Sequence, residues 1–519
     1  MKKLWKKLVA VTTAVMMAVT LLPAMANAET TIDYNRKGSI TINKTTNVEK
    51  KNTDGTNKEY EPLKDAEFTL YKIASLDKNG YTMLVKDVAG YTEADSLLNL
   101  SKDEQKTVAS QFANSTQTKT YMIDTPQLTD ANGQVKFTKL DLGYYLVVET
   151  NAPKGYVASV PFFVAVPTSN TADDSNKNPE DTQATSWVYD ITARPKNASV
   201  SIDKKIVESG EGKDATQAGV GEPVTYEITS ISPKYTQEYF TENGAEKDPT
   251  YTIHDTLSAG LTYNKDLTVT VDGTELKNTD TDVYYNVAGE TERGFSIAFT
   301  KKFLQTEQYK GKSVKVTYTA TVNKNAVVGP AGNTNTVTLD YNRTPGSNTT
   351  SATGTTTPKV YTYGLKLTKK DGNDNNTALT GAEFKIYKVV NGTETQIKNL
   401  DGMTDGIYTT SPNGKIIIKG LNAGTYKLEE VKAPTGYTLL KDKIEFTITG
   451  AEPANGTVTT TTNGFKEEGD GYVSTTVTNN KGFNLPSTGG MGTYIFTIAG
   501  LVIMAGAAFL LIASKKRRA

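Results

Sequence analysis

A 25-residue segment occurs twice in this 519-residue chain, and this repeat restricts the fold more than any other feature. The stretch from Asn132 to Tyr156 (NGQVKFTKLDLGYYLVVETNAPKGY) aligns without a gap on Asn413 to Tyr437 (NGKIIIKGLNAGTYKLEEVKAPTGY). Upstream, LKDAEFTLYK at Leu63 aligns with LTGAEFKIYK at Leu379. The two copies are 316 residues apart at this point, compared with 281 residues in the longer segment. The first and last parts of the chain therefore share one core, and the first copy carries an insertion.

Most segments outside the chain ends have the composition of β-strands. They are short runs rich in Val, Ile, Thr, Tyr and Phe, separated by Asn-Gly and Asp-Gly turns. The clearest helical signal, Leu97 to Phe112, falls inside the insertion, where Ser101 and Glu104 have the spacing of a capping box. A stretch rich in Thr, Ser, Gly and Pro from Thr344 to Pro358 is typical of a linker or long loop.

These patterns predict an all-β protein with three tandem domains and a small helical insertion in the first. The expected divisions are a signal peptide at 1–28, domains at 29–195, 196–357 and 358–484, and a C-terminal segment at 485–519.

Both ends of the chain carry targeting signals. Residues 1–28 combine a basic start, an apolar run and the small-residue site Ala26-Asn27-Ala28, which is typical of a cleaved secretory signal peptide. Near the other end, an apolar stretch from Met491 to Ala513 is long enough to span a bilayer and is followed by a basic cluster. It is preceded by the pentapeptide Leu485, Pro486, Ser487, Thr488 and Gly489.

This three-part C-terminal array resembles the Gram-positive cell-wall sorting signal. In that family a sortase, a transpeptidase with a catalytic cysteine, cleaves between the positions that match Thr488 and Gly489 and passes the threonyl acyl group to an amine. The resemblance implies a secreted protein with transient membrane anchoring, located in the cell wall or pilus of a Gram-positive bacterium.

Charge and cysteine content exclude several classes of function. Lys plus Arg and Asp plus Glu both total 57, so no basic surface for nucleic acid is expected. The chain has no cysteine, which excludes disulfides, thiol chemistry and cysteine-based zinc sites. We expect no cofactor and no metal, and the domains need another source of stability.

The last domain places three polar side chains in line with apolar neighbours on separate strands. Lys369 shares a strand face with Leu365 and Leu367, and Glu430 and Asn479 have the same kind of position on their strands. Pattern alone favours exposed side chains or a simple ion pair, because buried charges are costly. If these side chains are buried, the pKa of Lys369 falls and the pKa of Glu430 rises. A neutral amine of Lys369 can then attack the amide of Asn479, with Glu430 as proton shuttle.

The segment Tyr426 to Tyr437 resembles the E-box of Gram-positive pilus backbone subunits, whose Cna B-type domains contain autocatalytic Lys–Asn isopeptide bonds. It meets the family pattern Y-x-L-x-E-T-x-A-P-x-G-Y except that Val431 replaces threonine. The resemblance implies three tandem immunoglobulin-like, Cna-type β-sandwich domains and a Lys369–Asn479 bond formed with Glu430.

The middle domain has its own set of such residues. Its opening strand carries Lys204, and the segments around Asp255 and Asn335 resemble the family's Asp- and Asn-bearing segments. The resemblance implies a bond from Lys204 to Asn335 with Asp255 as proton shuttle. Asn333 lies on the same strand face as Asn335 and is the reserve candidate, so the choice between them stays open.

The first domain is expected to lack such a bond. It has Lys44 and an E-box with Glu149, but its last predicted strand ends in Ala193 where the last domain has asparagine.

A lysine between the first two domains completes the resemblance. Trp187 to Asn197 resembles the pilin motif W-x3-V-x-V-Y-P-K-N, with Ala193 and Arg194 as departures. In the family this lysine, here Lys196, accepts the threonyl carbonyl of the next subunit. Pro195 suits the role because it restricts the backbone on both sides of the peptide bond.

Two functional interpretations remain from the sequence. The first is a structural major pilin, polymerised head to tail through Thr488 and Lys196, with no enzymatic activity beyond its own internal bonds. The second is a monomeric wall-anchored adhesin that binds a host ligand. The expected partners are identical subunits, a pilus sortase, a housekeeping sortase and peptidoglycan, with minor pilins and host surface ligands as further candidates and no nucleic acid.

Overall fold

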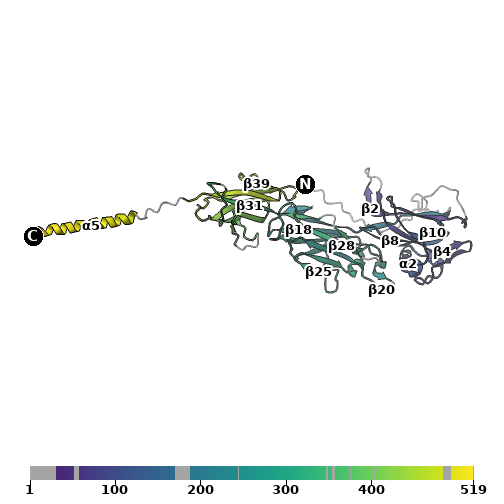
Figure 1. Cartoon of the computed structure of the whole chain (residues 1–519). Coiled ribbons are helices and arrows are strands. Elements are labelled where there is room, and N and C mark those ends of the chain that lie inside the picture. Colours follow the sequence, from purple (N-terminus) through teal and green to yellow (C-terminus); the bar gives the residue numbers. More distant parts are fainter. Residues whose placement is uncertain are drawn as a thin grey trace, which may run out of the picture.

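The computed structural model describes residues 31–51, 58–169, 187–242, 245–345, 349–353, 357–374, 376–400, 405–482 and 492–517. Three β units follow one another along an elongated molecule, and a long helix lies at its far end (Figure 1). The predicted all-β class and tandem sandwich architecture are confirmed. The predicted signal peptide and the LPSTG pentapeptide lie outside the described residues.

The first unit combines β-sheets with three short helices, α1 (Ala94–Leu98), α2 (Lys102–Asn114) and α3 (Thr116–Lys119). Its strands are β1 (Gly38–Asn43), β2 (Thr45–Lys51), β3 (Lys58–Pro62), β4 (Glu67–Asp77), β5 (Gly80–Met83), β6 (Met122–Leu128), β7 (Gln134–Leu140), β8 (Gly143–Asn151), β9 (Tyr156–Val157), β10 (Phe162–Val166), β11 (Thr168–Ser169), β12 (Trp187–Val188), β13 (Asp190–Ala193) and β14 (Lys196–Ser199). The sheet orders are β13-β1-β7, β10-β8-β4-β5 with β6 beside β4, β3-β2-β14-β9 and β11-β12.

The predicted helical insertion is confirmed, and it covers the outer face of the β4–β8 sheet. Helix α2 begins with the expected capping box between Ser101 and Glu104. Phe112 of α2 packs with Tyr144 and Leu146 of β8, whereas Tyr145 and Val147 point into the sandwich. Strand β8 is therefore buried on both faces, which explains its unbroken apolar run.

The middle unit is a sandwich of two large sheets. Its strands are β15 (Ile202–Glu208), β16 (Glu211–Lys213), β17 (Ala215–Gln217), β18 (Pro223–Ile231), β19 (Thr241–Glu242), β20 (Ala245–Glu246), β21 (Tyr251–Leu257), β22 (Leu261–Tyr263), β23 (Thr268–Val271), β24 (Thr274–Glu275), β25 (Tyr285–Thr291), β26 (Gly294–Phe299), β27 (Ser313–Val322), β28 (Asn333–Asn342), β29 (Thr349–Thr353) and β30 (Lys359–Tyr361). Its short helices are η1 (Gln237–Phe240), α4 (Lys301–Gln305) and η2 (Glu307–Tyr309).

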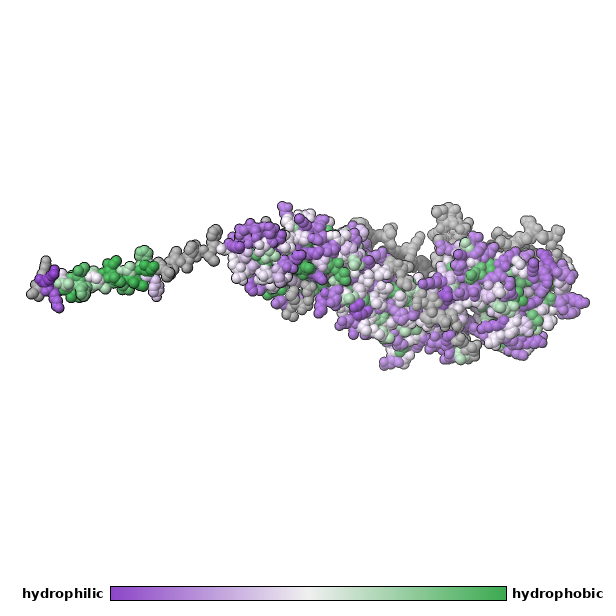
Figure 2. Space-filling view, viewed as in Figure 1, coloured by the Kyte–Doolittle hydropathy of each residue, from purple (hydrophilic) through white to green (hydrophobic). Residues whose placement is uncertain are grey.

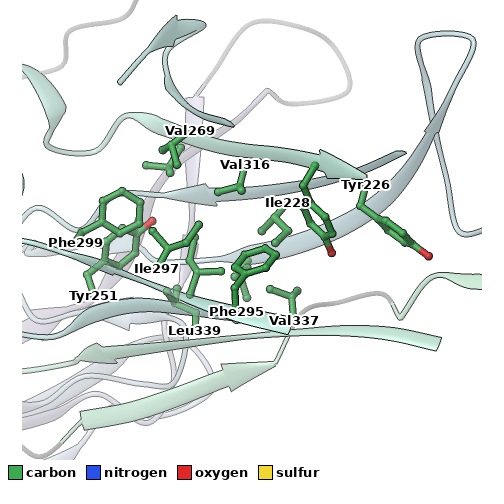
Figure 3. Packing of buried hydrophobic residues seen from close by; sticks show 14 of the residues in the cluster. Tyr226, Ile228, Tyr251, Val269, Phe295, Ile297, Phe299, Val316, Val337 and Leu339 are labelled. Carbon is green, nitrogen blue, oxygen red and sulfur yellow. The ribbon is translucent and has the colours of Figure 1, made fainter. Parts of the chain in front are cut away.

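Alternating side chains of these two sheets form the core of the middle unit. One sheet has the order β16-β15-β18-β27-β23-β24 with β22 beside β27, and the other has the order β17-β30-β28-β21-β26-β25 with β29 beside β28. Ile228 and Val316 of the first sheet face Ile297, Val337 and Leu339 of the second (Figure 3). The period-two burial along β27 and β28 is that of a sandwich strand with one face in the core.

The last unit repeats the β core of the first without the helices. Its strands are β31 (Tyr363–Asp371), β32 (Glu383–Val390), β33 (Thr393–Gln396), β34 (Tyr408–Thr409), β35 (Lys415–Leu421), β36 (Gly424–Lys432), β37 (Ile444–Gly450), β38 (Val458–Thr459), β39 (Phe465–Glu468) and β40 (Tyr472–Asn479). The sheets have the orders β35-β31-β40-β39 and β33-β32-β36-β37-β38, with β34 beside β32. Strand β36 alternates between buried and less buried positions, as expected of a strand with one face in the core.

Two details differ from the expected organisation. Strand β14 pairs with β2 and β9 of the first unit, so that unit extends to Ser199, beyond the boundary expected at residue 195. The expected linker also contributes structure, because β29 pairs with β28 over residues 349–353. The linker expectation is wrong for this segment, where threonines favour an added edge strand.

Hydrogen bonds join successive units. The backbone N–H of Gly155, in the E-box loop of the first unit, donates to the Tyr341 hydroxyl at 2.7 Å, and Arg343 donates to the carbonyl of Ala152 at 2.9 Å. Between the middle and last units, Glu222 accepts from Lys388 and Asn422, both at 2.6 Å. The units are therefore in direct contact at both junctions.

Helix α5 (Gly492–Lys516) is unlike the rest of the molecule. Its segment Tyr494–Lys516 is long and apolar enough to cross a membrane, and none of it is buried by the protein. Figure 2 shows a largely hydrophobic helix with a hydrophilic end, next to β units whose visible surface is mostly hydrophilic. This is the surface expected of the hydrophobic part of a sorting signal.

Candidate isopeptide sites and acceptor lysine

The last unit brings its three predicted residues together inside the sandwich. Lys369 of β31 and Asn479 of β40 lie on neighbouring parallel strands, with Asn479 opposite Asp371. Glu430 reaches them from β36 of the facing sheet, with its Oε1 3.1 Å from Lys369 Nζ and its Oε2 2.9 Å from Asn479 Nδ2. The Lys369 and Glu430 side chains have no solvent exposure, which excludes the simpler interpretation of exposed groups.

Burial also changes the chemistry of this lysine. It lowers the pKa of Lys369, and the nearby Glu430 carboxylate opposes this shift only in part. The Lys369 amine makes no hydrogen bond among the described residues, although the carboxylate lies within ion-pair distance. A lysine in this environment gives up its proton more readily than an exposed one, which is what a nucleophilic amine requires.

The middle unit places its predicted site residues on opposite sheets. Lys204 comes from β15, while Asp255 of β21 and Asn335 of β28 come from the facing sheet. Lys204 donates to Asp255 Oδ2, and both side chains have no solvent exposure. The hydroxyl of Tyr318 lies between Asp255 and Asn335: it donates to Asp255 Oδ1 at 2.9 Å and accepts from Asn335 Nδ2 at 2.7 Å.

The structure separates the two asparagines that the sequence left as alternatives. The amide of Asn333 is occupied by backbone groups, since it accepts from the N–H of Val327 and donates to the carbonyls of Val327 and Val360. Only Asn335 reaches the Tyr318 and Asp255 side. Asn333 therefore stabilises the backbone around Val327 and Val360, and Asn335 is the candidate for the bond with Lys204.

Burial shifts both ionisable groups of the middle site toward their neutral forms. Desolvation lowers the pKa of Lys204 to about 8, and the attraction of Asp255 only partly offsets it. Desolvation likewise raises the pKa of Asp255. Each shift makes transfer of the lysine proton to the carboxylate easier than it is in water.

The first unit contains a third group of the same kind, which the sequence did not predict. Lys44 Nζ lies 2.7 Å from Glu149 Oε2, and Asn197 Nδ2 donates to Glu149 Oε1 at 2.6 Å. All three side chains are buried, and burial lowers the pKa of Lys44. The basis for expecting no bond in this domain, the absence of a suitable asparagine, is therefore wrong.

The missed residue follows from strand register. Ala193 lies opposite Ile42, two residues before the lysine, whereas Asn197 lies opposite Thr46, two residues after it. This is the register of the last unit, where Asn479 lies opposite the second residue after Lys369. The repeat offset of 281 residues maps Asn479 onto position 198, one residue from Asn197, and this signal was available in the sequence.

The repeated segments supply the surroundings of the first and last lysines. The ring of Phe68 covers Lys44 at 5.5 Å and the ring of Phe384 covers Lys369 at 5.4 Å, and both belong to the repeated Ala-Glu-Phe. The glycines of the repeated Asn-Gly pairs, at 133 and 414, have positive φ. A Cβ there would lie 2.2 or 2.5 Å from the carbonyl oxygen of the lysine, so only glycine fits.

One electrostatic feature is common to all three sites. The side-chain Oδ1 atoms of Asn197, Asn335 and Asn479 are buried and accept no hydrogen bond from the described residues. An unsatisfied buried acceptor costs about 1–3 kcal/mol. In each site the asparagine carbonyl is therefore poorly solvated.

Lys196 lies beside the first of these sites but faces away from it. On strand β14 the side chain of Asn197 points inward to Glu149, so the adjacent Lys196 points to the opposite face. There its half-buried ammonium lies 3.1 Å from the centroid of the Tyr60 ring. The backbone of Lys196 pairs with Thr45, so this lysine projects from a hydrogen-bonded strand and not from a loose linker.

The single histidine of the chain, His254, precedes Asp255 in the sequence but does not pair with it. The two side chains lie on opposite faces of β21. His254 bridges neighbouring strands through Ser296 at 2.8 Å and Asp340 at 3.2 Å. We read it as a cross-strand contact of the sheet surface.

Comparison with known proteins gives matches along most of the chain. Residues 38–179 and 363–465 match the family described as a prealbumin-like fold domain, and residues 220–345 match the Cna-B-like domain of Gram-positive pilin backbone subunit 2. Residues 477–519 match the LPXTG cell wall anchor motif. These matches cover all three β units and the C-terminal helix.

Relatives extend over nearly the whole length. Fimbrial subunit type 1 of Actinomyces viscosus is 27% identical over 550 residues, covering 95% of this chain and 93% of the relative. The trypsin-resistant surface T6 protein of Streptococcus pyogenes is 26% identical, covering 74% and 81%. Two solved structures are similar in fold. The T6 backbone pilin of S. pyogenes has a TM-score of 0.59 and 22% identity, covering 86% of this chain and 99% of that one. The major pilin SpaD of Corynebacterium diphtheriae has a TM-score of 0.55 and 22% identity, covering 88% of this chain and 100% of that one.

The fold and the anchor motif together define a multidomain surface protein attached to a Gram-positive cell wall. This chain belongs to the backbone subunits of Gram-positive pili. It is a structural fimbrial subunit with a cell-wall anchor, and it resides in a surface pilus.

Proposed function

We propose that this subunit is polymerised head to tail through an isopeptide bond between Thr488 of one copy and Lys196 of the next. A pilus sortase would cleave between Thr488 and Gly489, and the Lys196 amine would accept the threonyl acyl group. A housekeeping sortase would then transfer the completed fibre to peptidoglycan. The observation that carries the proposal is the position of Lys196 on a paired strand at a domain junction, beside an aromatic ring and facing away from the core.

We also propose that internal Lys–Asn bonds reinforce each unit: Lys369 with Asn479, Lys204 with Asn335, and Lys44 with Asn197. In each case the carboxyl group of Glu430, Asp255 or Glu149 first takes a proton from the lysine ammonium. The neutral amine attacks Cγ of the asparagine, the amide nitrogen receives a proton and departs as ammonia, and an amide bond remains. Burial favours the first step because it favours the neutral amine.

The arrangement of these bonds suits a fibre under tension. In the first and last units the bond would join neighbouring parallel strands, and in the middle unit it would join the two sheets. A covalent bond keeps the strands in register under a load that would break the hydrogen bonds between them. Such a crosslink also restricts the unfolded chain, as a disulfide does.

The direct test is the covalent junction itself. Pili purified from boiled cell-wall extract would be digested with trypsin and searched by tandem mass spectrometry for a branched peptide that joins Thr488 to the Nζ of Lys196. We expect this peptide in the polymer fraction and not in the monomer fraction. A junction at another lysine, or a wall-anchored chain found only as monomer, would contradict the linkage and favour the monomeric adhesin.

A separate prediction concerns the first unit. Asn197→Ala should leave the Lys44–Asn197 bond unformed, so the variant chain loses two molecules of ammonia where the unchanged chain loses three. The chain-entropy estimate for a loop of this length is about 5 kcal/mol of lost stability in the first unit. Intact mass and thermal unfolding would be measured on the full secreted chain.

Asn132→Ala, in an exposed turn of the same unit, is the matched control and should keep all three bonds. An unchanged ammonia loss in Asn197→Ala, after allowing for the substitution, would exclude this bond and leave the other two untouched.

A further inference from the structure

Among the residues that the structure describes, Tyr318 occupies a place in the middle site that has no counterpart in the other two sites. Its hydroxyl connects the carboxyl group to the amide, with 2.9 Å to Asp255 Oδ1 and 2.7 Å to Asn335 Nδ2. The side chain is buried, at 1% exposure. Lys204 Nζ lies 5.3 Å from the centroid of its ring. The tyrosine therefore touches both groups between which a proton has to move.

In the other two sites the carboxyl group touches the amide directly. Asn479 Nδ2 lies 2.9 Å from Glu430 and Asn197 Nδ2 lies 2.6 Å from Glu149. In the middle unit the carboxyl belongs to an aspartate, which is one methylene group shorter than glutamate. The asparagine amide there donates to the tyrosine hydroxyl and not to the carboxylate.

We propose that the Tyr318 hydroxyl relays a proton from Asp255 to the side-chain nitrogen of Asn335, which makes Tyr318 a catalytic residue of the middle unit. The inference rests on the proposed Lys204–Asn335 bond and adds a residue to its chemistry. It also accounts for an aspartate at this site, because the phenol spans the distance that a glutamate spans elsewhere.

The protons balance along this route. The Lys204 ammonium gives one proton to Asp255 Oδ2, and the neutral amine attacks Cγ of Asn335. Tyr318 then gives its phenolic proton to the amide nitrogen and in the same step takes one from Asp255. The carbon–nitrogen bond breaks, ammonia leaves, and Asp255 takes the remaining extra proton from the new amide nitrogen. Tyr318 ends as it began, with its proton.

The surroundings hold the phenol in this role. Its ring stacks on Tyr226 with centroids 5.5 Å apart, and it packs edge-on against Phe295 at 5.0 Å and Tyr263 at 5.5 Å. Burial raises the pKa of Tyr318 well above its ordinary value, so the hydroxyl keeps its proton until a proton is returned in the same step. Tyr226, whose ring stacks on that of Tyr318, makes no hydrogen bond to Asp255 within the described chain, so it cannot take a proton back from that carboxyl group.

The test is the rate of bond formation in Tyr318→Phe, which keeps the ring and removes the hydroxyl. The full chain would be made by cell-free translation and quenched at intervals. After trypsin digestion, the crosslinked and free peptides of Lys204 and Lys369 would be quantified together. Because general acid catalysis contributes about 10²–10⁴-fold, we expect the Lys204–Asn335 bond to form at least about 100-fold more slowly. The Lys369–Asn479 bond in the same molecules should form at the unchanged rate.

Three further variants separate catalysis from packing. Tyr263→Phe removes a hydroxyl from a ring in contact with Tyr318, where that hydroxyl donates only to Glu290, and should leave the rate unchanged. Tyr226→Phe should likewise leave it largely unchanged. Asp255→Glu combined with Tyr318→Phe should restore much of the rate, because the longer carboxyl group can reach Asn335 directly. A folding defect would not be rescued by this second change.

The outcomes also separate the two proposals. If the unchanged chain forms no bond at Lys204, the proposed chemistry of the middle unit fails. If it forms the bond and Tyr318→Phe forms it equally fast, the bond stands and the relay is wrong. Loss of the rate in Tyr226→Phe instead would assign the role to that residue and overturn the proposal for Tyr318.

Discussion

Replacing Lys196 with alanine is expected to remove the ladder of covalent multimers and leave single subunits in the cell wall. The amine of Lys196 is the proposed acceptor of every intersubunit bond, so its loss stops the polymer at the first step. The substitution should not disturb folding, since Lys196 is only half-buried and faces away from the core. The measurement is an immunoblot of boiled cell-wall extract from cells that carry the variant as their only copy.

Two companion variants make this result specific. Lys196→Arg keeps the positive charge and the contact with the ring of Tyr60, but a guanidinium is not a nucleophile at neutral pH, so the ladder should be lost equally. Lys136→Ala removes an exposed lysine of the same unit and should leave the ladder intact. A ladder that persists in Lys196→Ala would place the linkage elsewhere.

The second large effect is expected from Glu430→Gln. Glutamine has the shape of glutamate but cannot take the lysine proton, so the Lys369–Asn479 bond should not form and the chain should retain one ammonia. Without that crosslink, which closes a loop of about 100 residues, the last unit should lose about 4–5 kcal/mol of stability in the chain-entropy estimate. For a domain of this size we expect its unfolding temperature to fall by roughly 10–20 °C.

Intact mass, calorimetry of the full secreted chain and trypsin digestion would measure this effect. The matched control is Glu429→Gln. Glu429 precedes Glu430 on β36, so its carboxylate lies on the other face of the strand, where it accepts a hydrogen bond from the Tyr387 hydroxyl at 2.6 Å. This variant should lose as much ammonia as the unchanged chain and should unfold at the same temperature. An ammonia loss in Glu430→Gln equal to that of the unchanged chain would remove Glu430 from the chemistry.

Most of the large-scale architecture could be read from local patterns. Alternation of apolar and polar residues predicts sandwich strands, and the capping box of Ser101 and Glu104 predicts the start of the inserted helix. Alternation also places Lys369 and Glu430 in line with apolar neighbours on their strands, but the cost of a buried charge favoured exposed side chains, and only the structure shows both buried. The alternation and the capping box depend on residues a few positions apart, so sequence alone carries them.

The site of the first unit shows where prediction from local sequence patterns fails. Ala193 was aligned with Asn479 because both end a strand-like run, yet register places Asn197 at that position. The run is interrupted by Arg194 and Pro195, and only the pairing of β14 with β2 shows that the strand resumes in the same register. A motif that marks Lys196 for assembly thus also contains the asparagine of an internal site.

The sequence by itself determined the repeat, the all-β class and the C-terminal anchor, and it predicted a signal peptide and the lysine and carboxyl residues of each unit, because each is encoded in contiguous residues or in short periods. Only the tertiary structure gave Asn333 and Asn335 different surroundings, brought Asn197 to Glu149, and inserted Tyr318 between Asp255 and Asn335. The contacts of Asn197, Tyr318 and Asn335 join strands whose contacting residues are 17 to 63 positions apart. Their partners are selected by register and by sheet packing, which no local pattern specifies.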